Sequence, residues 1–213
     1  MALLVKICGI TRPEDAAAAA AAGADALGVN LWPGSKRFVG DEGAARAVLE
    51  AVPLGVLKVG VFVNAAPLEV AAVAARLGLD RVQLHGDERP EAFAGIPGLD
   101  RARVVRAVRV RDAGSFADDA RWDAHLFLYD AFVDGYGGAG TTAPWDLIAA
   151  QASRPFWLAG GLRPENVGAA VRAVRPDGLD VASGVESAPG RKDAALMRAF
   201  VAAARAAASP SGR

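Results

Sequence analysis

Short runs of β-branched and other apolar residues alternate along this chain with longer, alanine-rich runs that carry polar residues at helical spacing. Apolar runs of about four to eight residues are typical of strands, and longer periodic runs are typical of helices. The predicted strands are 3–8, 26–31, 57–63, 81–85, 103–108, 126–130, 156–159 and 179–182. The predicted helices are 14–22, 42–51, 67–77, 89–94, 113–119, 145–152, 164–174 and 192–207.

The regular alternation of strands and helices predicts parallel strands joined by helical crossovers. About eight such units in 213 residues predict an α/β protein, a single (β/α)8 TIM barrel, a fold of about 200–250 residues. An open doubly wound sheet is the alternative, but it usually has a glycine-rich turn after its first strand. Here that turn reads Cys8-Gly9-Ile10-Thr11. We expect residues 1–208 to form one catalytic domain and residues 209–213 to be a disordered tail.

Several predicted strands carry polar residues, although parallel strands that are buried on both faces are usually apolar throughout. The residues that share a face are Lys6 with Cys8, Lys58 with Gly60 and Phe62, Gln83 with His85, and Leu128 with Asp130, and Asp180 lies in the last strand. Charges inside a barrel are costly unless they are paired or serve a ligand. We therefore expect these faces to point into the barrel, where they serve a polar ligand, and the apolar faces to pack against the helices.

The charge balance and the single cysteine limit the partners and the cellular compartment that we expect for this protein. Lys+Arg and Asp+Glu both number 24, so the formal net charge is zero. We expect neither a nucleic-acid partner nor an anionic membrane partner, because both require a basic excess. One cysteine forms no internal disulfide, and the N-terminus lacks a signal-peptide pattern, so we expect a cytoplasmic protein. No metal is expected, because Cys8, His85 and His125 do not have the spacing of metal ligands.

Barrel enzymes carry out their chemistry at the carboxyl ends of their strands. Cys8, His85 and Asp130 occupy such ends, whereas His125 begins its strand at the opposite end and is interpreted as structural. Each residue alone also fits a structural role, because a cysteine among apolar neighbours is often inert and an aspartate after a strand often caps the next loop.

Two glycine-containing loops follow the last two predicted strands, at 158–166 and 180–190. The loops after strands seven and eight are the common phosphate site of such barrels. The backbone amides of Gly160, Gly161, Ser183 and Gly184 are therefore candidates to bind a phosphate close to a helix N-terminus. The alternative is that these glycines only turn the chain.

Taken in order, the motifs resemble those of the phosphoribosylanthranilate isomerase family of tryptophan biosynthesis, over nearly the whole chain. The matching segments are Lys6-Ile-Cys-Gly-Ile-Thr11, Gly23-Ala-Asp25, Ser35-Lys-Arg37 with Val39, Val61-Phe-Val-Asn64, Val82-Gln-Leu-His-Gly-Asp-Glu88, Asp130 with Gly137-Gly-Ala-Gly140, Ala159-Gly-Gly-Leu162 with Pro164-Glu-Asn-Val167, and Asp180-Val-Ala-Ser-Gly-Val-Glu186 with Pro189-Gly190 and Lys192-Asp193. Each segment is a weak signal alone, but their joint order is specific.

The resemblance implies an Amadori rearrangement of N-(5-phosphoribosyl)anthranilate to 1-(2-carboxyphenylamino)-1-deoxyribulose 5-phosphate, without a cofactor. It assigns the general base to Cys8, the general acid to Asp130 and the anthranilate carboxylate contact to Arg37. It assigns phosphate binding to the glycine loops at 160–161 and 183–184. Lys6, His85 and Asp180 are candidates for a supporting shell, and Lys6 is expected to make the Cys8 thiol more acidic than a free cysteine.

Two other functions remain as alternatives. The related aminoaldose isomerase of histidine biosynthesis performs the same rearrangement but usually has an aspartate where this chain has Cys8. A non-catalytic barrel that binds a phosphorylated ligand would not need Cys8 together with Asp130. The expected partner is a phosphorylated small molecule, and the chain is expected to be a monomer or a homodimer.

Overall fold

Eight parallel strands pair in chain order and close into a barrel in this computed structural model, which describes residues 3–117, 119–124, 126–132, 142–152 and 155–209. Lys6 of the first strand pairs with Ala26 of the second strand and with Asp180 of the last strand. This closure confirms the predicted barrel and excludes the open sheet. The strands are β1 Leu4–Cys8, β2 Ala26–Asn30, β3 Leu57–Phe62, β4 Arg81–Leu84, β5 Val104–Val110, β6 Leu126–Ala131, β7 Phe156–Leu158 and β8 Gly178–Val181.

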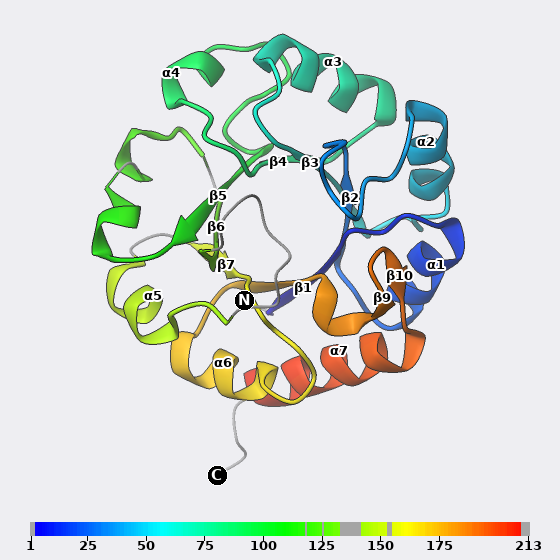
Figure 1. Cartoon of the computed structure of the whole chain (residues 1–213), viewed down its shortest axis with the longest axis vertical. Helices are drawn as coiled ribbons and strands as arrows, with labels where there is room; N and C mark the ends of the chain where they lie inside the picture. The colour runs from blue at the N-terminus through cyan, green and yellow to red at the C-terminus, as the bar shows by residue number, and fades with distance from the viewer. Residues whose placement is uncertain (1–2, 118, 125, 133–141, 153–154, 210–213) are drawn as a thin grey trace.

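Helices surround the barrel and cover its outer face, as Figure 1 shows. They are α1 Pro13–Ala21, α2 Glu42–Glu50, α3 Pro67–Leu77, α4 Pro90–Phe93, α5 Trp145–Gln151, α6 Val167–Val174 and α7 Ala194–Ala208. Proline in the first turn of α1, α3 and α4 has the φ of a helix start and lacks only an amide that would be unpaired there. Asp41 and Asp193 cap α2 and α7 through backbone amides.

The apolar residues form two separate clusters, one on each side of the barrel wall. A small cluster fills the interior and includes Val59, Leu128 and Trp157, while a much larger one lies between the strands and the helices. The predicted inward faces of β1, β4, β6 and β8 are confirmed, because Lys6 meets Gln83 and Asp180 inside the barrel and His85 lies beside Asp130.

The expectation for β3 was wrong. Phe62 belongs to the outer cluster, and a Cβ on Gly60 would meet Leu79 of the outer layer, so the face that carries Lys58 points toward the helices. Val59, which lies between Lys58 and Gly60 in the sequence, fills the barrel interior instead. Because adjacent residues of a strand point to opposite sides, an inward Val59 forces Lys58 outward, where it keeps partial contact with solvent.

Three predicted helices differ from the observed elements. The segment predicted as a helix at 113–119 contains a 3-10 turn, η1 Ala113–Phe116, and a second one, η2 Asp119–Arg121, lies nearby. Asp112 and Ser115 form a reciprocal capping box around η1, and such local side-chain bonds favour a short turn. The predicted helix 164–174 begins only at Val167, and the predicted helix 192–207 begins at Ala194.

A short hairpin that the sequence did not predict separates β8 from α7. The chain passes through a 3-10 turn, η3 Ser183–Val185, into β9 Glu186–Ala188 and returns in β10 Arg191–Lys192. Figure 1 shows the hairpin between α1 and α7, and the Lys192 amide donates to Asp15 of α1 over 3.2 Å. The hairpin places Glu186 and Lys192 beside the end of β1.

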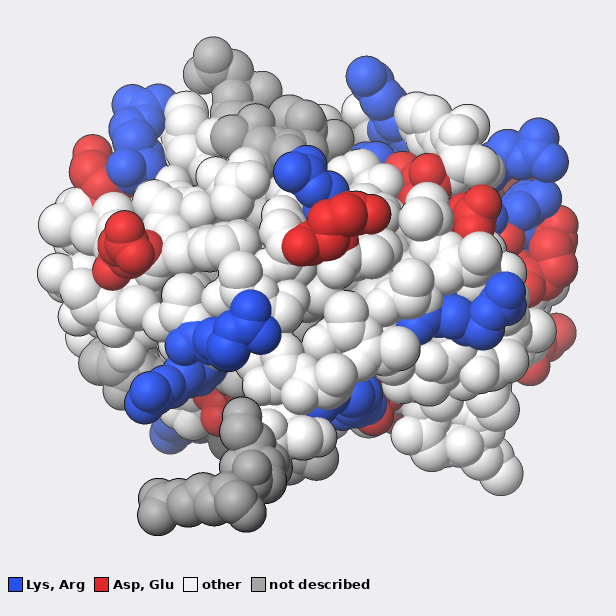
Figure 2. Space-filling view, turned by 90° about the horizontal axis from the view of Figure 1, so that it is seen from below, with Lys and Arg blue, Asp and Glu red and all other residues white. Residues whose placement is uncertain are grey.

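Three of the features discussed above lie outside the described residues: His125, the matching segment at residues 137–140, and the predicted tail beyond Ser209, the residue that caps the C-terminus of α7. No helix of the described residues is long and apolar enough to cross a membrane. Figure 2 shows acidic and basic side chains interspersed over one face of the molecule, without a large area of a single sign.

Candidate active site

Cys8 ends β1, and its thiol shares a confined space with the ammonium of Lys6. Both side chains lie against Gly28 in the neighbouring strand β2. A Cβ at Gly28 would be 2.8 Å from Cys8 Sγ and 3.2 Å from Lys6 Nζ, both of them closer than ordinary packing allows. Glycine at this position therefore leaves the room in which the thiol and the ammonium lie side by side.

Lys6 is fully buried, yet its charge has partners. Its Nζ donates to Asp180 Oδ1 over 2.9 Å and to Gln83 Oε1 over 3.0 Å. Burial lowers the pKa of Lys6, but the negative charge of Asp180 and the neighbouring Cys8 outweigh it, and the pKa ends above its ordinary value. The barrel interior thus contains a permanent positive charge next to the thiol.

The effect of that charge on the thiol differs from our expectation. Burial raises the pKa of Cys8, the positive charge of Lys6 lowers it, and the negative charge of Asp180 raises it again, so that the pKa lies above its ordinary value. The expected acidic thiol was therefore wrong, because the loss of water around a thiolate outweighs the attraction of Lys6. Cys8 still keeps partial exposure, so a ligand can reach it.

Asp130 lies inward from β6, and contacts on both of its oxygens hold its carboxyl group. Oδ1 accepts from the backbone amide of Ala131 over 2.8 Å, and Oδ2 lies 3.4 Å from His85 Nε2. A Cβ at Gly160 would be 2.6 Å from that amide nitrogen and 3.0 Å from Asp130 Oδ1. Gly160, with a φ of +86°, is therefore required next to the carboxyl group for space as well as for its backbone conformation.

Arg37, in the loop after β2, lies across the end of β1 and binds Glu186 of the hairpin. Its Nε donates to Glu186 Oε1 over 2.8 Å and its Nη2 donates to Oε2 over 2.7 Å. A Cβ at Gly9 would lie 2.5 Å from Arg37 Cδ, so the glycine after Cys8 makes room for the arginine. The Arg37 side chain is only 11% exposed, which contrasts with the solvated arginine usual in a polar loop.

Lys192 holds Glu186 from the other side. Its Nζ donates to Glu186 Oε1 over 2.8 Å and to the carbonyl of Ala182 over 3.1 Å, and its side chain is fully buried. Burial alone would raise the pKa of Glu186, but the hydrogen bond from Arg37 and the charge of Lys192 outweigh burial and hold that pKa below its ordinary value. Burial lowers the pKa of Lys192 more than Glu186 raises it.

The two glycine loops pack against each other. A Cβ at Gly184 would collide with the backbone oxygen of Leu162 in the other loop. Gly160 and Gly161 both have positive φ, and Asn166 ties their loop together by donating to the carbonyl of Gly161 over 2.9 Å. Gly184 is thus needed for packing whatever else it binds, so a Gly184→Asp substitution would disturb the loop itself.

A family model described as N-(5'-phosphoribosyl)anthranilate (PRA) isomerase matches residues 5–203. The isomerase of this name from Rubrobacter xylanophilus is 49% identical over 206 residues, which cover 94% of this chain and 98% of that protein. The one from Magnetococcus marinus is 47% identical over 214 residues, with full coverage of both chains.

The chain belongs to the phosphoribosylanthranilate isomerase family.

Solved structures of family members have the same barrel. The phosphoribosylanthranilate isomerase of Thermotoga maritima superposes with a TM-score of 0.86 at 39% identity, covering 96% of this chain and 99% of that one. Another structure of such an isomerase, in complex with reduced 1-(o-carboxyphenylamino)-1-deoxyribulose 5-phosphate, gives a TM-score of 0.83 at 37% identity, with the same coverage.

The structure gathers the candidates that the sequence of this isomerase family member singled out. Lys6 and Asp180 meet below Cys8, and His85 meets Asp130. The contacts of these residues were not predicted: Gln83 bridges Lys6 and His85, Glu186 binds Arg37, and Lys192 binds Glu186. The alternation along β4 puts Gln83 and His85 on one face, and this is the signal in the sequence that points to the first contact. Nothing local linked Arg37 to a residue 149 positions away.

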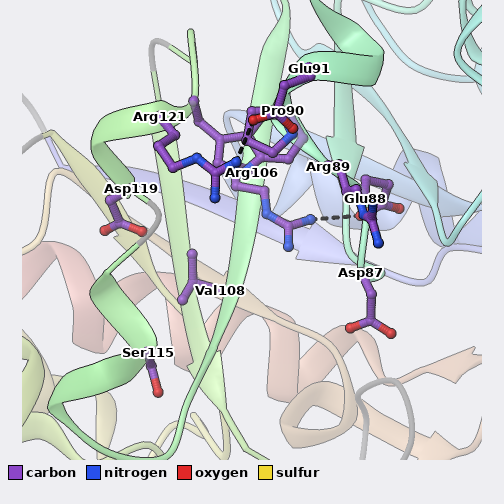
Figure 3. Close-up of a pocket in the computed structure, with 11 residues that line it drawn as sticks. Asp87, Glu88, Arg89, Pro90, Glu91, Arg106, Val108, Ser115, Asp119 and Arg121 are labelled. Atoms are coloured by element: carbon purple, nitrogen blue, oxygen red, sulfur yellow. Dashed lines mark hydrogen bonds and ion pairs between the residues drawn. The ribbon is translucent and has the colours of Figure 1, made fainter.

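A polar pocket of about 490 Å³ lies along the outer side of β5, and Figure 3 shows the residues that line it. Two of its arginines are paired: Arg106 donates to Glu88 over 2.6 Å and Arg121 binds Glu91. Arg106 also covers the ring of Trp122 at 4.9 Å. None of the predicted site residues of the isomerase lines this pocket. Among the residues that the structure describes, no three His, Cys, Asp or Glu side chains form a metal-binding group.

Proposed function

We propose that this chain converts N-(5'-phosphoribosyl)anthranilate to 1-(2-carboxyphenylamino)-1-deoxyribulose 5-phosphate, the isomerisation step of tryptophan biosynthesis, with Cys8 as general base and Asp130 as general acid. Family membership over residues 5–203 supports the reaction. The observation that carries the assignment of roles is the position of Cys8 and Asp130, both inward at the carboxyl ends of strands of one barrel.

Asp130 begins the reaction by protonating the furanose oxygen of the substrate. The C1′–oxygen bond breaks, and the anthranilate nitrogen supplies the electron pair that forms the Schiff base. His85 Nε2 and the amide of Ala131 flank the two carboxyl oxygens, so the group is oriented before it transfers its proton. An acid positioned in this way typically contributes about 10²–10⁴-fold to the rate.

Cys8 then removes the C2′ proton, and the electron pair moves toward the Schiff-base nitrogen to give an enolamine. The enol loses its hydroxyl proton as C1′ gains one, which yields the ketone with no net change in protons. Lys6 is the main group that favours the thiolate in this site, against the burial that disfavours it. The positive charge of a protonated Schiff base favours the thiolate further at the moment when the base is needed.

Arg37 binds the anthranilate carboxylate in this proposal. Glu186 occupies the edge of the guanidinium formed by Nε and Nη2. A guanidinium carries five N–H groups, so the edge formed by Nη1 and the second Nη2 hydrogen is left for a bidentate carboxylate contact. Glu186 thereby orients the arginine without consuming its binding capacity.

The phosphate lies at the two glycine loops in this proposal. Among the described residues, none accepts a hydrogen bond from the amides of Gly160 or Gly161. The positive φ of both glycines turns the loop at the carboxyl end of β7. Ser183 and Gly184 contribute amides from the first turn of η3, where backbone donors have no partner within the turn. A phosphate bound here supplies remote binding energy that positions the reacting carbons.

The remaining expectations stay part of this proposal. Residues 1–208 are treated as one catalytic domain in the cytoplasm that acts on a phosphorylated small molecule without a cofactor and has no nucleic-acid partner. A relative from Thermotoga maritima is described as dimeric, and this chain is expected to be a monomer or a homodimer, which light scattering of the purified protein distinguishes. The histidine-pathway alternative fits less well, because β1 ends in a cysteine.

The deciding experiment follows the fluorescence of phosphoribosylanthranilate, which disappears on conversion, and identifies the product by mass and chromatography. The wild-type chain is expected to turn over, while Cys8→Ser and Asp130→Asn lose most of kcat. A folded wild-type chain with no turnover of this substrate would contradict the function, and turnover that survives both substitutions would contradict the assigned roles.

A further inference from the structure

Gln83 is a buried residue on the inward face of β4, and its side-chain amide lies between Lys6, which neighbours Cys8, and His85, which neighbours Asp130. It is 1% exposed. Its Oε1 accepts from Lys6 Nζ over 3.0 Å, and its Nε2 lies 2.8 Å from His85 Nδ1. His85 Nε2 in turn lies 3.4 Å from Asp130 Oδ2. A continuous series of polar contacts therefore runs from Asp180 through Lys6, Gln83 and His85 to Asp130.

The chemistry of Lys6 fixes which way the amide of Gln83 faces. An ammonium only donates hydrogen bonds, so the atom of Gln83 that meets Lys6 Nζ must be the amide oxygen. Lys6 cannot turn away freely, because Asp180 Oδ1 holds it at 2.9 Å. The NH₂ group of Gln83 consequently faces His85 Nδ1, and since an NH₂ group only donates, Nδ1 must be the acceptor.

This orientation determines the proton on His85. With its lone pair on Nδ1 engaged, a neutral imidazole carries its hydrogen on Nε2. Nε2 is buried, has no hydrogen-bond partner that meets standard geometry among the described residues, and points to within 3.4 Å of Asp130 Oδ2. Hydrogen bonds of catalytic groups are often long before substrate binds and tighten in the complex.

We propose that Gln83 is a positioning residue that fixes His85 in the Nε2–H tautomer and so directs a hydrogen-bond donor at the carboxyl group of Asp130. The proposal rests on the proposed function for the role of Asp130. With this tautomer, Nε2–H and the amide of Ala131 provide one donor for each carboxyl oxygen. With the other tautomer, the Nε2 lone pair would face Oδ2, and two acceptors would repel each other in a buried site once Asp130 has given up its proton.

The ordinary alternative is that Gln83 only provides Lys6 with a second acceptor. In that case the loss of Gln83 would act through Lys6 and Cys8, and the tautomer of His85 would not matter. The two interpretations differ in a spectroscopic property of His85 and in whether the effect of Gln83 depends on His85. Both differences can be measured without knowledge of the orientation in which the substrate binds.

The first test is the ¹⁵N NMR spectrum of the chain labelled in histidine. The sequence contains only two histidines, so His125→Asn assigns the His85 signals. In the folded wild type we expect the shift of an unprotonated Nδ1 and a proton-bearing Nε2. A wild-type His85 with its proton on Nδ1 overturns the proposal, and this outcome is independent of whether the chain turns over phosphoribosylanthranilate.

The second test is Gln83→Glu, which keeps the shape but replaces the NH₂ donor with an acceptor. One carboxylate oxygen still accepts from Lys6, and the other now requires a hydrogen on His85 Nδ1. We expect the Nδ1 signal to become that of a protonated nitrogen. kcat should fall about 10- to 100-fold with little change in KM, the range seen when the partner that orients a functional histidine is removed from a metal site. A hydrogen on Nδ1, an Nε2 without one and an undiminished kcat would together overturn the proposal.

A double-mutant cycle separates this effect from one on Lys6. If Gln83 acts through His85, Gln83→Glu should cost little further kcat in a His85→Gln background. The same loss in both backgrounds would show that the added charge acts on Lys6 and Cys8, and would overturn the proposal. The wild-type spectrum needs no substitution at position 83, so it remains decisive if Gln83→Glu fails to fold.

Discussion

Glu186 engages one edge of the Arg37 guanidinium with two hydrogen bonds of 2.8 and 2.7 Å, and Lys192 holds the same carboxylate from behind. The arginine that is proposed to recognise the anthranilate carboxylate is thus part of a three-residue ion network. Its orientation is set by the hairpin of β9 and β10, which is far from the Arg37 loop in the sequence. An arginine side chain that is already held in place loses less conformational entropy on binding a planar ligand than a mobile, solvated arginine side chain does.

Arg37→Ala should mainly raise KM, because it removes a contact made in the ground state as well as in the transition state. A hydrogen-bonded charge pair is worth about 1.5–3 kcal/mol, or roughly 10- to 100-fold in KM. Glu186→Gln keeps one acceptor for Arg37 and should give a smaller increase. Steady-state kinetics measures both, and an unchanged KM for Arg37→Ala would rule out the carboxylate contact.

Asp130→Asn should abolish most turnover while it leaves product binding nearly intact. The amide is almost isosteric but cannot deliver a proton, so kcat should fall by about 10²–10⁴-fold. Binding of the product, followed by calorimetry, serves as the control for the integrity of the site. Near wild-type kcat in the folded variant would show that another group protonates the substrate.

Cys8, the only cysteine, should react slowly with iodoacetamide at neutral pH. Because burial raises the pKa of the thiol, the labelling rate should rise with pH through an inflection above the ordinary cysteine value. Lys6→Met removes the charge that opposes this shift and should move the inflection to still higher pH. Mass spectrometry of the labelled chain gives the rate, and an inflection below the ordinary value would contradict the direction stated here.

Ligand protection and Cys8→Ser complete this test. Saturating product should slow the labelling of the wild type, whereas a cysteine reached only by unfolding would not respond to product. Cys8→Ser should fold normally, as judged by thermal unfolding, and should lose turnover, because a serine hydroxyl is too weak an acid to provide a ready base. Full activity of the serine variant would leave the proposed mechanism without its base.

The phosphate site calls for a matched pair of variants at Gly161. Its φ of +62° is in the left-handed region, which asparagine and aspartate tolerate better than other side chains do. Gly161→Asp and Gly161→Asn have nearly the same shape, so the difference between them isolates the effect of a negative charge. Product affinity should fall much further for Asp than for Asn, and equal affinities would remove the phosphate from this loop.

The order of the strands and the inward position of Cys8, Asp130 and Asp180 could be predicted from the sequence, because they follow from local periodicity and from the rule that barrels work at their carboxyl ends. The side to which the Lys58 face of β3 points could not be predicted from the sequence, because Gly60 and Phe62 are compatible with either side of a strand. The decisive contact there, between the side of Gly60 and Leu79, appears only once the helices are packed.

Two features of the site, the Arg37–Glu186 contact and the pKa of Cys8, could not be predicted from neighbouring residues in the sequence, each for a different reason. The contact of Arg37 with Glu186 joins a loop near the start of the chain to a hairpin near its end, and no spacing rule connects them. The acidity of Cys8 was misjudged because Lys6, two residues away, is visible in the sequence while burial is not. The pKa of a thiol reflects its charged neighbours as well as its burial, and for Cys8 the effect of burial is the larger.

The bond between Lys6 and Asp180 also bears on the order in which the molecule forms. These residues are 174 positions apart, and the bond joins the first strand to the last. Until β8 joins the barrel, Lys6 lacks the carboxylate of Asp180 that pairs with it, and a charge without a partner resists burial. Such long-range closure is slow to form compared with local contacts. The proposed catalytic centre is therefore completed only with the final strand, so enzymatic activity during refolding should be among the last signals to recover.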